Sequence, residues 1–259
     1  MSGLTVLATG PETLFGVDDV ASVAGSVVGS MPTGVPFTGP DGRPALGALG
    51  VLVDDVLGYA IIDSLAPGSW SVSTEIWIDL LAPLPADASR VHADARAVQA
   101  GSFATGRVVD ADGRLLAECR ERGREIADVP DAVDGPPPVE LPAGAAGLAE
   151  LIGLRPEGDH FVLHVTPVLG NPRHMLHGGV SLCASELAAT YSRQADAPHL
   201  MTSSLHIVHT RPVPSGARME FHVTSSHAGR SLWISDVVGS VEGRPCTLAR
   251  VSAQAAPTA

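Results

Sequence analysis

The sequence repeats itself at an interval of about 130 residues. The segment LGALGVLVDDVLGYA (46–60) aligns without a gap over HGGVSLCASELAATY (177–191), which places Asp55 over Glu186. Further along, IWIDLLAPLPAD (76–87) aligns over LHIVHTRPVPSG (205–216), with Pro83 over Pro212. Helix pattern, proline and turn recur in the same order, so the chain is expected to build two copies of one structural unit.

Each copy predicts the same sequence of elements. A leading strand (20–30 or 160–168) is followed by a loop and one long apolar helix. Four segments of alternating polarity then predict antiparallel strands, with hairpin turns at DADG (110–113) and VEGR (241–244). One helix against one sheet, present twice, is an α+β architecture. We therefore expect repeats over 1–127 and 148–259, joined by a linker over 128–147 that is rich in proline and glycine.

Composition excludes several classes of function. The net charge is −12, and all sixteen basic residues are arginine, so the chain lacks the basic surface that nucleic acids require. No apolar stretch is long enough for a membrane span, and the N-terminus does not read as a signal peptide. The three cysteines have no metal-type or disulfide spacing. We expect a cytoplasmic protein that binds neither membrane nor nucleic acid.

The second copy carries a recognisable motif. His177, Gly178 and Gly179 form an HGG string, with Asn171 seven positions before Gly178 and Glu186 eight positions after it. This pattern resembles the hotdog-fold acyl-CoA thioesterases of the phenylacetate-pathway and 4-hydroxybenzoyl-CoA types. The resemblance implies a tandem double hotdog, in which two long central helices pack on one continuous antiparallel sheet. It also implies hydrolysis of an acyl-CoA, with no cofactor besides the coenzyme A of the substrate.

The glycines suit binding of the carbonyl oxygen in that hydrolysis, and the acids suit general-base catalysis. A helix N-terminus presents unpaired N–H groups, and glycine allows the oxygen of a thioester carbonyl to approach Gly178 and Gly179 closely. A carboxylate in an apolar helix is costly unless it has a role, and burial makes it a better base. This argument applies to Asp55 and Glu186, and register favours Asp55 over Asp54.

Distance along the helix separates these parts. Eight residues of helix span roughly 12 Å, so Gly178 and Glu186 cannot act on the same carbonyl. If the two helices pack antiparallel, the start of each lies beside the acid of the other, and each site is shared between the copies. Site one then combines Asn171, His177, Gly178 and Gly179 with Asp55. Site two combines Gly47 with Glu186, and it should be the weaker one, because Pro40 stands where Asn171 stands in the second copy.

The resemblance adds further residues. Family members carry a hydroxyl ten positions before the strand proline, which corresponds here to Ser73 and Thr202, and Thr190 also matches some members. Arg230 and Arg211 are candidates for contacts with the phosphates of coenzyme A. Family habit also suggests a homodimer of double hotdogs.

Three other interpretations remain open from sequence. GNPRHMLH resembles a loop of hotdog-fold hydratases and dehydratases, although its expected Asp is absent. A zinc site could be drawn from His174, His177 and Cys183 or Glu186, but no second cluster completes it, and no metal is expected. The altered motif of the first copy is also compatible with a non-catalytic module that binds acyl-CoA.

Overall fold

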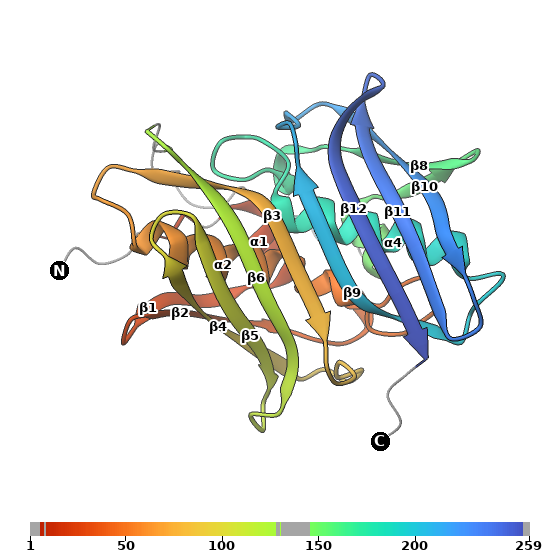
Figure 1. Ribbon diagram of the computed structural model, residues 1–259, viewed down its shortest axis with the longest axis horizontal. Coiled ribbons are helices and arrows are strands. Elements are labelled where there is room, and N and C mark those ends of the chain that lie inside the picture. The colour runs from red at the N-terminus through yellow and green to blue at the C-terminus, as the bar shows by residue number, and fades with distance from the viewer. Residues whose placement is uncertain (1–5, 8, 128–129, 131–145, 256–259) are drawn as a thin grey trace.

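The computed structural model describes residues 6, 7, 9–127, 130 and 146–255. Its main feature is one twelve-stranded sheet in which every pair of neighbouring strands is antiparallel (Figure 1). The spatial order is β1-β2-β4-β5-β6-β3-β9-β12-β11-β10-β8-β7, so each half of the chain contributes six adjacent strands. The strands are β1 (Asp18–Val23), β2 (Ser26–Pro32), β3 (Trp70–Leu80), β4 (Arg90–Gln99), β5 (Phe103–Asp110), β6 (Leu115–Ile126), β7 (Arg155–Glu157), β8 (His160–His164), β9 (Leu200–His209), β10 (Arg218–Ala228), β11 (Leu232–Val241) and β12 (Arg244–Ala255).

The two halves join through β3 and β9 in the middle of the sheet. Register pairs run from Glu75 opposite Val208 to Asp79 opposite Ser204. Between them, Trp77 stacks on His206 with 4.4 Å between ring centroids. This ladder makes the sheet continuous, and the predicted large antiparallel sheet is confirmed.

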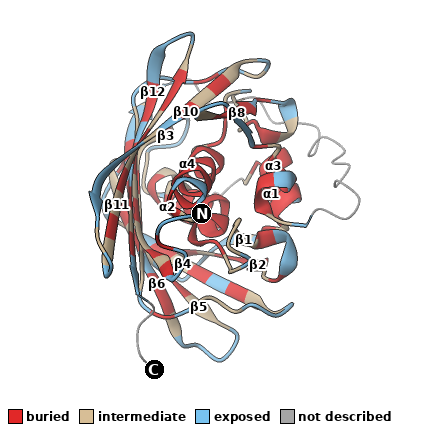
Figure 2. Cartoon of the chain, turned by 90° about the vertical axis from the view of Figure 1, so that its right-hand side faces the viewer, coloured by how far each residue is buried: buried red, intermediate tan, exposed pale blue. Residues whose placement is uncertain are grey.

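Helices cover one face of the sheet, as Figure 2 shows. The two longest are α2 (Gly50–Asp63) and α4 (Gly178–Arg193), and nearly all of their residues are buried. The sheet, the neighbouring helix and the shorter helices surround them, so most of their side chains are apolar and the few buried polar ones need partners. The shorter ones are α1 (Gly10–Phe15), α3 (Leu148–Ile152) and the 3₁₀ turns η1 (Val35–Phe37), η2 (Leu46–Leu49) and η3 (Pro167–Leu169).

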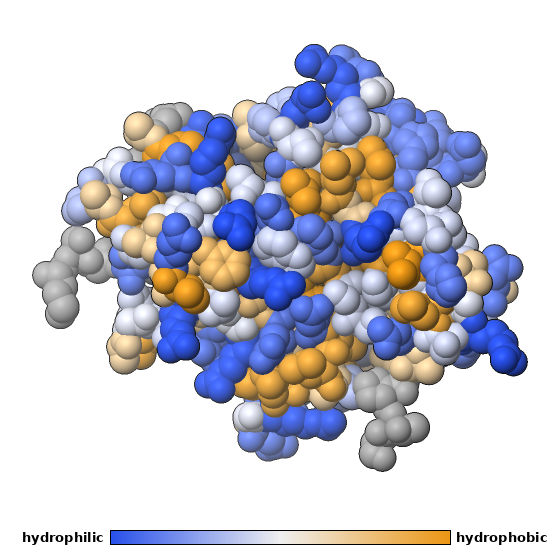
Figure 3. Space-filling model, in the orientation of Figure 1, coloured by the Kyte–Doolittle hydropathy of each residue, from blue (hydrophilic) through white to orange (hydrophobic). Residues whose placement is uncertain are grey.

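The opposite face of the sheet is turned toward the viewer in Figure 3, where hydrophobic and hydrophilic side chains are interspersed. Strand alternation decides which side chains reach this face: Ile76 and Ile78 point into the core, and Trp77 between them points outward. None of the helices among the described residues is both long and apolar enough to cross a membrane.

Helices α2 and α4 run antiparallel where they touch. A Cβ placed on Gly47 would contact Cys183, one on Gly50 would collide with the backbone of Gly179, and one on Gly178 would contact Asp54. Residue numbers therefore rise along one helix as they fall along the other. Gly50 and Gly179 lie backbone against backbone, and the absence of side chains at these two positions allows the helices to cross this closely.

Two expectations on the leading strands were wrong in detail. The segment 20–30 is a hairpin of β1 and β2, because Ala24 and Gly25 adopt left-handed φ values of 51° and 84° and reverse the chain. In the second half, β8 ends at His164, and Pro167 opens η3 where a strand was expected to continue. The predicted linker over 128–147 lies almost entirely outside the described residues.

Candidate active site

A pocket of about 510 Å³ opens beside the N-terminal end of α4. It lies within the size range of small-molecule sites. Both halves of the chain line it: α2, β3 and β6 come from the first, and the loop before α4, α4 itself and the end of β9 come from the second. Its apolar wall is formed by Tyr59, Ile62, Trp70, Val72, Ile126, Met175, Leu176 and Val213.

Asp54 is the carboxylate that links the two halves in this pocket. It is only 8% exposed, yet both of its oxygens are used. Oδ1 accepts a hydrogen bond from Ser73 Oγ at 2.5 Å, and Oδ2 accepts one from the N–H of Gly179 at 2.8 Å. A helix N-terminus favours a negative charge, so the start of α4 stabilises this buried carboxylate.

The contacts expected of Asp55 are thus made by its neighbour. Asp55 Oδ1 instead lies 3.3 Å from His177 Nε2, and Oδ2 has no hydrogen-bond partner among the described residues. The physical reason is the 3₁₀ turn η2, which precedes α2 but has no counterpart directly before α4. Each 3₁₀ residue turns the chain by about 120° where an α-helical residue turns it by about 100°, so four residues shift the phase by roughly one position.

Ser73 connects Asp54 to a second buried acid. Its hydroxyl lies 2.5 Å from Asp54 Oδ1 and 2.8 Å from Glu121 Oε1, but it has a single hydrogen to donate. Burial, followed by the charge of Asp54, raises the pKa of Glu121 well above its usual range. A protonated Glu121 resolves the conflict, because it donates to Ser73 while Ser73 donates to Asp54.

His177 is the N-cap of α4 and lies between the two aspartates of α2. Its Nδ1 is 3.1 Å from Asp54 Oδ2, and its Nε2 is 3.3 Å from Asp55 Oδ1. Burial alone would lower the pKa of His177, but the charge of Asp54 and the hydrogen bond with Asp55 outweigh it and raise the pKa to about 10. Burial and the charge of Glu12 raise the pKa of Asp55 to about 7.

The other residues predicted for site one also reach the pocket. Gly178 lines it and is the first residue of α4, so its N–H has no acceptor within the helix. Asn171 uses its carboxamide oxygen to accept from the N–H groups of Arg173 and Met175, and its NH₂ group donates to no other described residue. Ser73, His177 and both glycines therefore lie around Asp54, and Asn171 lines the same pocket.

His209, at the end of β9, borders the same point. A Cβ on Gly178 would lie 2.7 Å from Asp54 Oδ2 and 3.2 Å from His209 Cε1, so these two side chains flank the helix start. His209 Nε2 is 3.0 Å from Ser181 Oγ, and burial lowers the pKa of this histidine.

The two predicted phosphate contacts have different positions. Arg211 is exposed and lines the pocket, as do Arg124 and Arg173. Arg230 is not among the lining residues: its backbone carbonyl bonds to His199, just before β9 begins. Because a strand rises about 3.3 Å per residue, the ten residues of β9 separate Arg230 from the pocket by roughly 30 Å.

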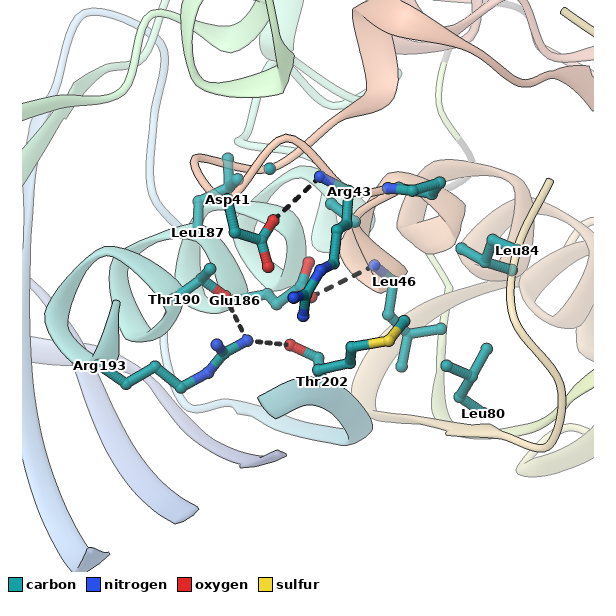
Figure 4. A pocket seen from close by; sticks show the side chains of 14 residues that line it. Asp41, Arg43, Leu46, Leu80, Leu84, Glu186, Leu187, Thr190, Arg193 and Thr202 are labelled. Atoms are coloured by element: carbon teal, nitrogen blue, oxygen red, sulfur yellow. Dashed lines mark hydrogen bonds between the residues drawn. The ribbon is translucent and has the colours of Figure 1, made fainter. Parts of the chain in front are cut away.

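The residues predicted for site two come together, but around a filled space (Figure 4). Glu186 accepts from the N–H groups of Gly47, at 2.7 Å, and Leu46, at 3.2 Å. The guanidinium of Arg193 donates to Thr190, Thr202 and the carbonyl of Leu200. The remaining cavity of about 30 Å³ has room for little more than one water molecule.

The residues considered for zinc do not gather. His174 is exposed, Cys183 is buried, and Glu186 belongs to the second site. Within the described parts of the chain, one group has the spacing to hold a metal ion: Glu12, Asp55 and His177 have ligand atoms within 4.8 Å of one another. Glu12 Oε2 already accepts two hydrogen bonds from Thr9.

Sequence reasoning missed Glu121 and Arg193. The first had a signal, because strand alternation in LLAECRERG places Glu121 on the inward-facing series with Cys119 and Gly123. An acid in that series needs a partner. Arg193 ends the apolar run of α4 as an ordinary basic residue at a helix C-terminus, and nothing local distinguishes it.

Comparisons with known proteins bear on the fold. No family model and no curated protein matches the sequence. The structure is similar to the TesB protein of Mycobacterium avium subspecies paratuberculosis, with a TM-score of 0.61 and 15% identity, covering 95% of this chain and 98% of that one. It is also similar to the 12:0-ACP thioesterase of Umbellularia californica, with a TM-score of 0.58 and 12% identity, covering 88% and 94%. The chain thus has the fold of these two proteins.

Proposed function

We propose that this protein hydrolyses an acyl thioester to the free acid and the thiol, at a single site shared between its two halves. One observation carries the proposal. The buried carboxylate of Asp54, from the first half, bonds to Ser73 and to the start of α4, from the second half, inside a pocket of about 510 Å³. The fold shared with solved thioesterases supports the same reaction.

In this reaction Asp54 acts on the attacking water, and Gly178 and Asn171 act on the carbonyl oxygen. A water molecule beside Asp54 and Ser73 attacks the thioester carbonyl carbon, and Asp54 takes a proton from this water as general base. The carbonyl oxygen, which becomes negative, faces the N–H of Gly178 and the NH₂ of Asn171. The tetrahedral intermediate collapses, the carbon–sulfur bond breaks, and the proton on Asp54 returns to the departing thiolate.

Hydrogen bonds from Glu121 to Ser73 and from Ser73 to Asp54 fix the orientation of the Asp54 carboxylate. Because protonated Glu121 donates to Ser73 and Ser73 donates to Asp54, Oδ1 has one defined donor, and Oδ2 has the N–H of Gly179. A carboxylate held at both oxygens presents its remaining lone pairs in one direction, which is what a positioned base requires.

The substrate class follows from the pocket walls. Tyr59, Trp70 and Ile126 offer an apolar surface for the acyl group. Arg124 and Arg211 are exposed at the same pocket, and guanidinium groups suit phosphates. In a chain of charge −12 these local arginines favour a phosphate-bearing thiol such as coenzyme A as the carrier.

The second site takes no part in this function. The Arg193 side chain occupies the volume in which a substrate would lie, and Glu186 is engaged by the N–H groups of Leu46 and Gly47. We assign it a structural role.

The test is release of thiol from a panel of acyl-CoA thioesters, followed with a thiol reagent, for the wild type and for Asp54→Asn. We expect turnover on at least one thioester and its loss in the variant. Water addition to an enoyl-CoA without thiol release would indicate a hydratase. Saturable binding of acyl-CoA without turnover would indicate a binding module. Either result would overturn the proposal.

A further inference from the structure

His177 and Asp55 lie behind the proposed base and are not used in the reaction described above. His177 is 5% exposed and Asp55 is also 5% exposed, so their contacts are made almost entirely within the protein. A buried histidine among acids needs a definite arrangement of protons, because each ring nitrogen either donates or accepts.

The geometry at Nδ1 restricts that arrangement. The N–H of Gly179 has two acceptors within hydrogen-bond distance: Asp54 Oδ2 at 2.8 Å and, as the N-cap contact of α4, His177 Nδ1 at 3.1 Å. These two acceptor atoms are themselves 3.1 Å apart. If Nδ1 were unprotonated, two lone-pair atoms at hydrogen-bond distance would compete for one N–H. A hydrogen on Nδ1 resolves the competition: Nδ1 donates to Asp54, and Gly179 donates to Asp54 as well.

The other ring nitrogen of His177, Nε2, lies beside Asp55. Nε2 faces Asp55 Oδ1 at 3.3 Å, and Asp55 Oδ2 has no hydrogen-bond partner among the described residues. The groups that face His177 are Asp54 and Asp55 from α2, Glu12 from α1, and His209 from β9. Three of these four are acids, and the pKa of His209 is lowered by burial, so the surroundings favour a positive charge on His177.

We infer that His177 is a buried imidazolium clamp, which donates one N–H to Asp54 and one to Asp55 and so holds Asp54 as a carboxylate. In this arrangement His177 and Asp55 are positioning residues: His177 acts through Asp54, and Asp55 acts through His177. The inference rests on the proposed function in so far as it treats Asp54 as the base.

In this arrangement His177 provides a positive charge beside the carboxylate of Asp54. An opposite charge within about 4–6 Å stabilises a carboxylate. Asp54 also lies close to Ser73 and Glu121, and Glu121 is neutral when protonated. His177 is the cation that pairs with Asp54, with 3.1 Å between Nδ1 and Oδ2.

The direct test is NMR titration of His177 in the intact protein with ¹⁵N-labelled histidine, assigned by comparison with His177→Asn. We expect both ring nitrogens to remain protonated from pH 6 to above pH 8. In Asp55→Asn the imidazolium should lose its proton at a lower pH than in the wild type. A neutral His177 at pH 7 overturns the inference, and so does a signal that changes on treatment with EDTA, because a metal held by Glu12, Asp55 and His177 requires a neutral imidazole.

A kinetic test adds a readout that a purely structural role would not move. In His177→Asn, which keeps a donor beside Asp54 but removes the charge, the acid limb of kcat/KM should move to higher pH. His174→Asn, at an exposed position on the same loop, is the matched control and should leave the profile in place. An unshifted acid limb in folded His177→Asn contradicts the clamp. Full turnover by Asp54→Asn contradicts the proposed function instead, and the NMR result stands apart from both.

Discussion

The N–H of Gly179 donates a hydrogen bond of 2.8 Å to Asp54, 125 residues earlier in the chain. This contact joins the start of one helix to the acid of the other and defines the pocket that both halves line. It also distinguishes Asp54 from Asp55, although the two are adjacent in sequence and both are buried.

The first prediction separates these two aspartates. Asp54→Asn should lower kcat by about 10²–10⁴-fold, the contribution typical of a general base. Asp55→Asn should cause a smaller loss, because Asp55 contacts His177 and has no contact with Ser73. Steady-state turnover of both variants on the best acyl-CoA, with circular dichroism to confirm folding, checks this. If Asp55→Asn were inactive and Asp54→Asn active, Asp55 would be the base after all.

The second prediction separates the two glycines at the start of α4. A Cβ on Gly179 would collide with the backbone of Gly50, so Gly179→Ala should lower the free energy of unfolding by about 1–3 kcal/mol. A Cβ on Gly178 would meet the Asp54 carboxylate and the His209 ring, so Gly178→Ala should mainly lower kcat. Chemical denaturation and turnover of the pair test this division. Equal losses of stability with unchanged turnover would contradict it.

The third prediction concerns pH and Glu121. The pKa of Glu121 is raised by burial, so the folded state keeps a proton that the unfolded state releases above about pH 4.5. Stability due to this group should therefore fall as the pH rises through that range. Glu121→Gln, which mimics the protonated acid, should become more stable relative to the wild type between about pH 5 and 8. Thermal melts across that range measure the difference, and a constant difference would show that Glu121 is ionised in the folded protein.

The fourth prediction concerns the filled second site. Glu186→Ala should retain most of the turnover but lower stability, because it leaves the N–H groups of Leu46 and Gly47 buried without an acceptor. Each such group costs about 1–3 kcal/mol. Turnover and melting temperature measured on one preparation check both parts. Loss of turnover in a folded Glu186→Ala would mean that the second site works.

The fifth prediction tests the carrier. Arg211→Ala should raise KM for a coenzyme A thioester several-fold while leaving KM unchanged for the same acyl group on N-acetylcysteamine, which has no phosphate. Arg230→Ala is the matched control, since Arg230 lies away from the pocket. A rise of KM for both thiols would indicate that Arg211 shapes the pocket and does not bind phosphate.

Much of the fold could be predicted from sequence. The repeat predicted two like units, and strand alternation predicted the eight strands that follow the two helices. The hairpin of β1 and β2 was not predicted, because its turn has Ala24 in a left-handed conformation and alanine gives no local signal for such a turn. The residues predicted for site one lie at or beside one pocket, but the contacts expected of Asp55 are made one position earlier, by Asp54. That displacement depends on η2, and a 3₁₀ turn and an α turn of four residues look alike in sequence.

The two halves that meet at the β3–β9 ladder belong to one polypeptide, so each can change in sequence without the other. In a dimer of identical subunits, every substitution occurs in both subunits, so an arginine that fills one cleft also fills the other. Here Arg193 and Asp54 are encoded at unrelated positions, and a mutation in one half has no copy in the other. One cleft could therefore be given over to holding the molecule together while its counterpart stayed open, and the two can continue to diverge independently.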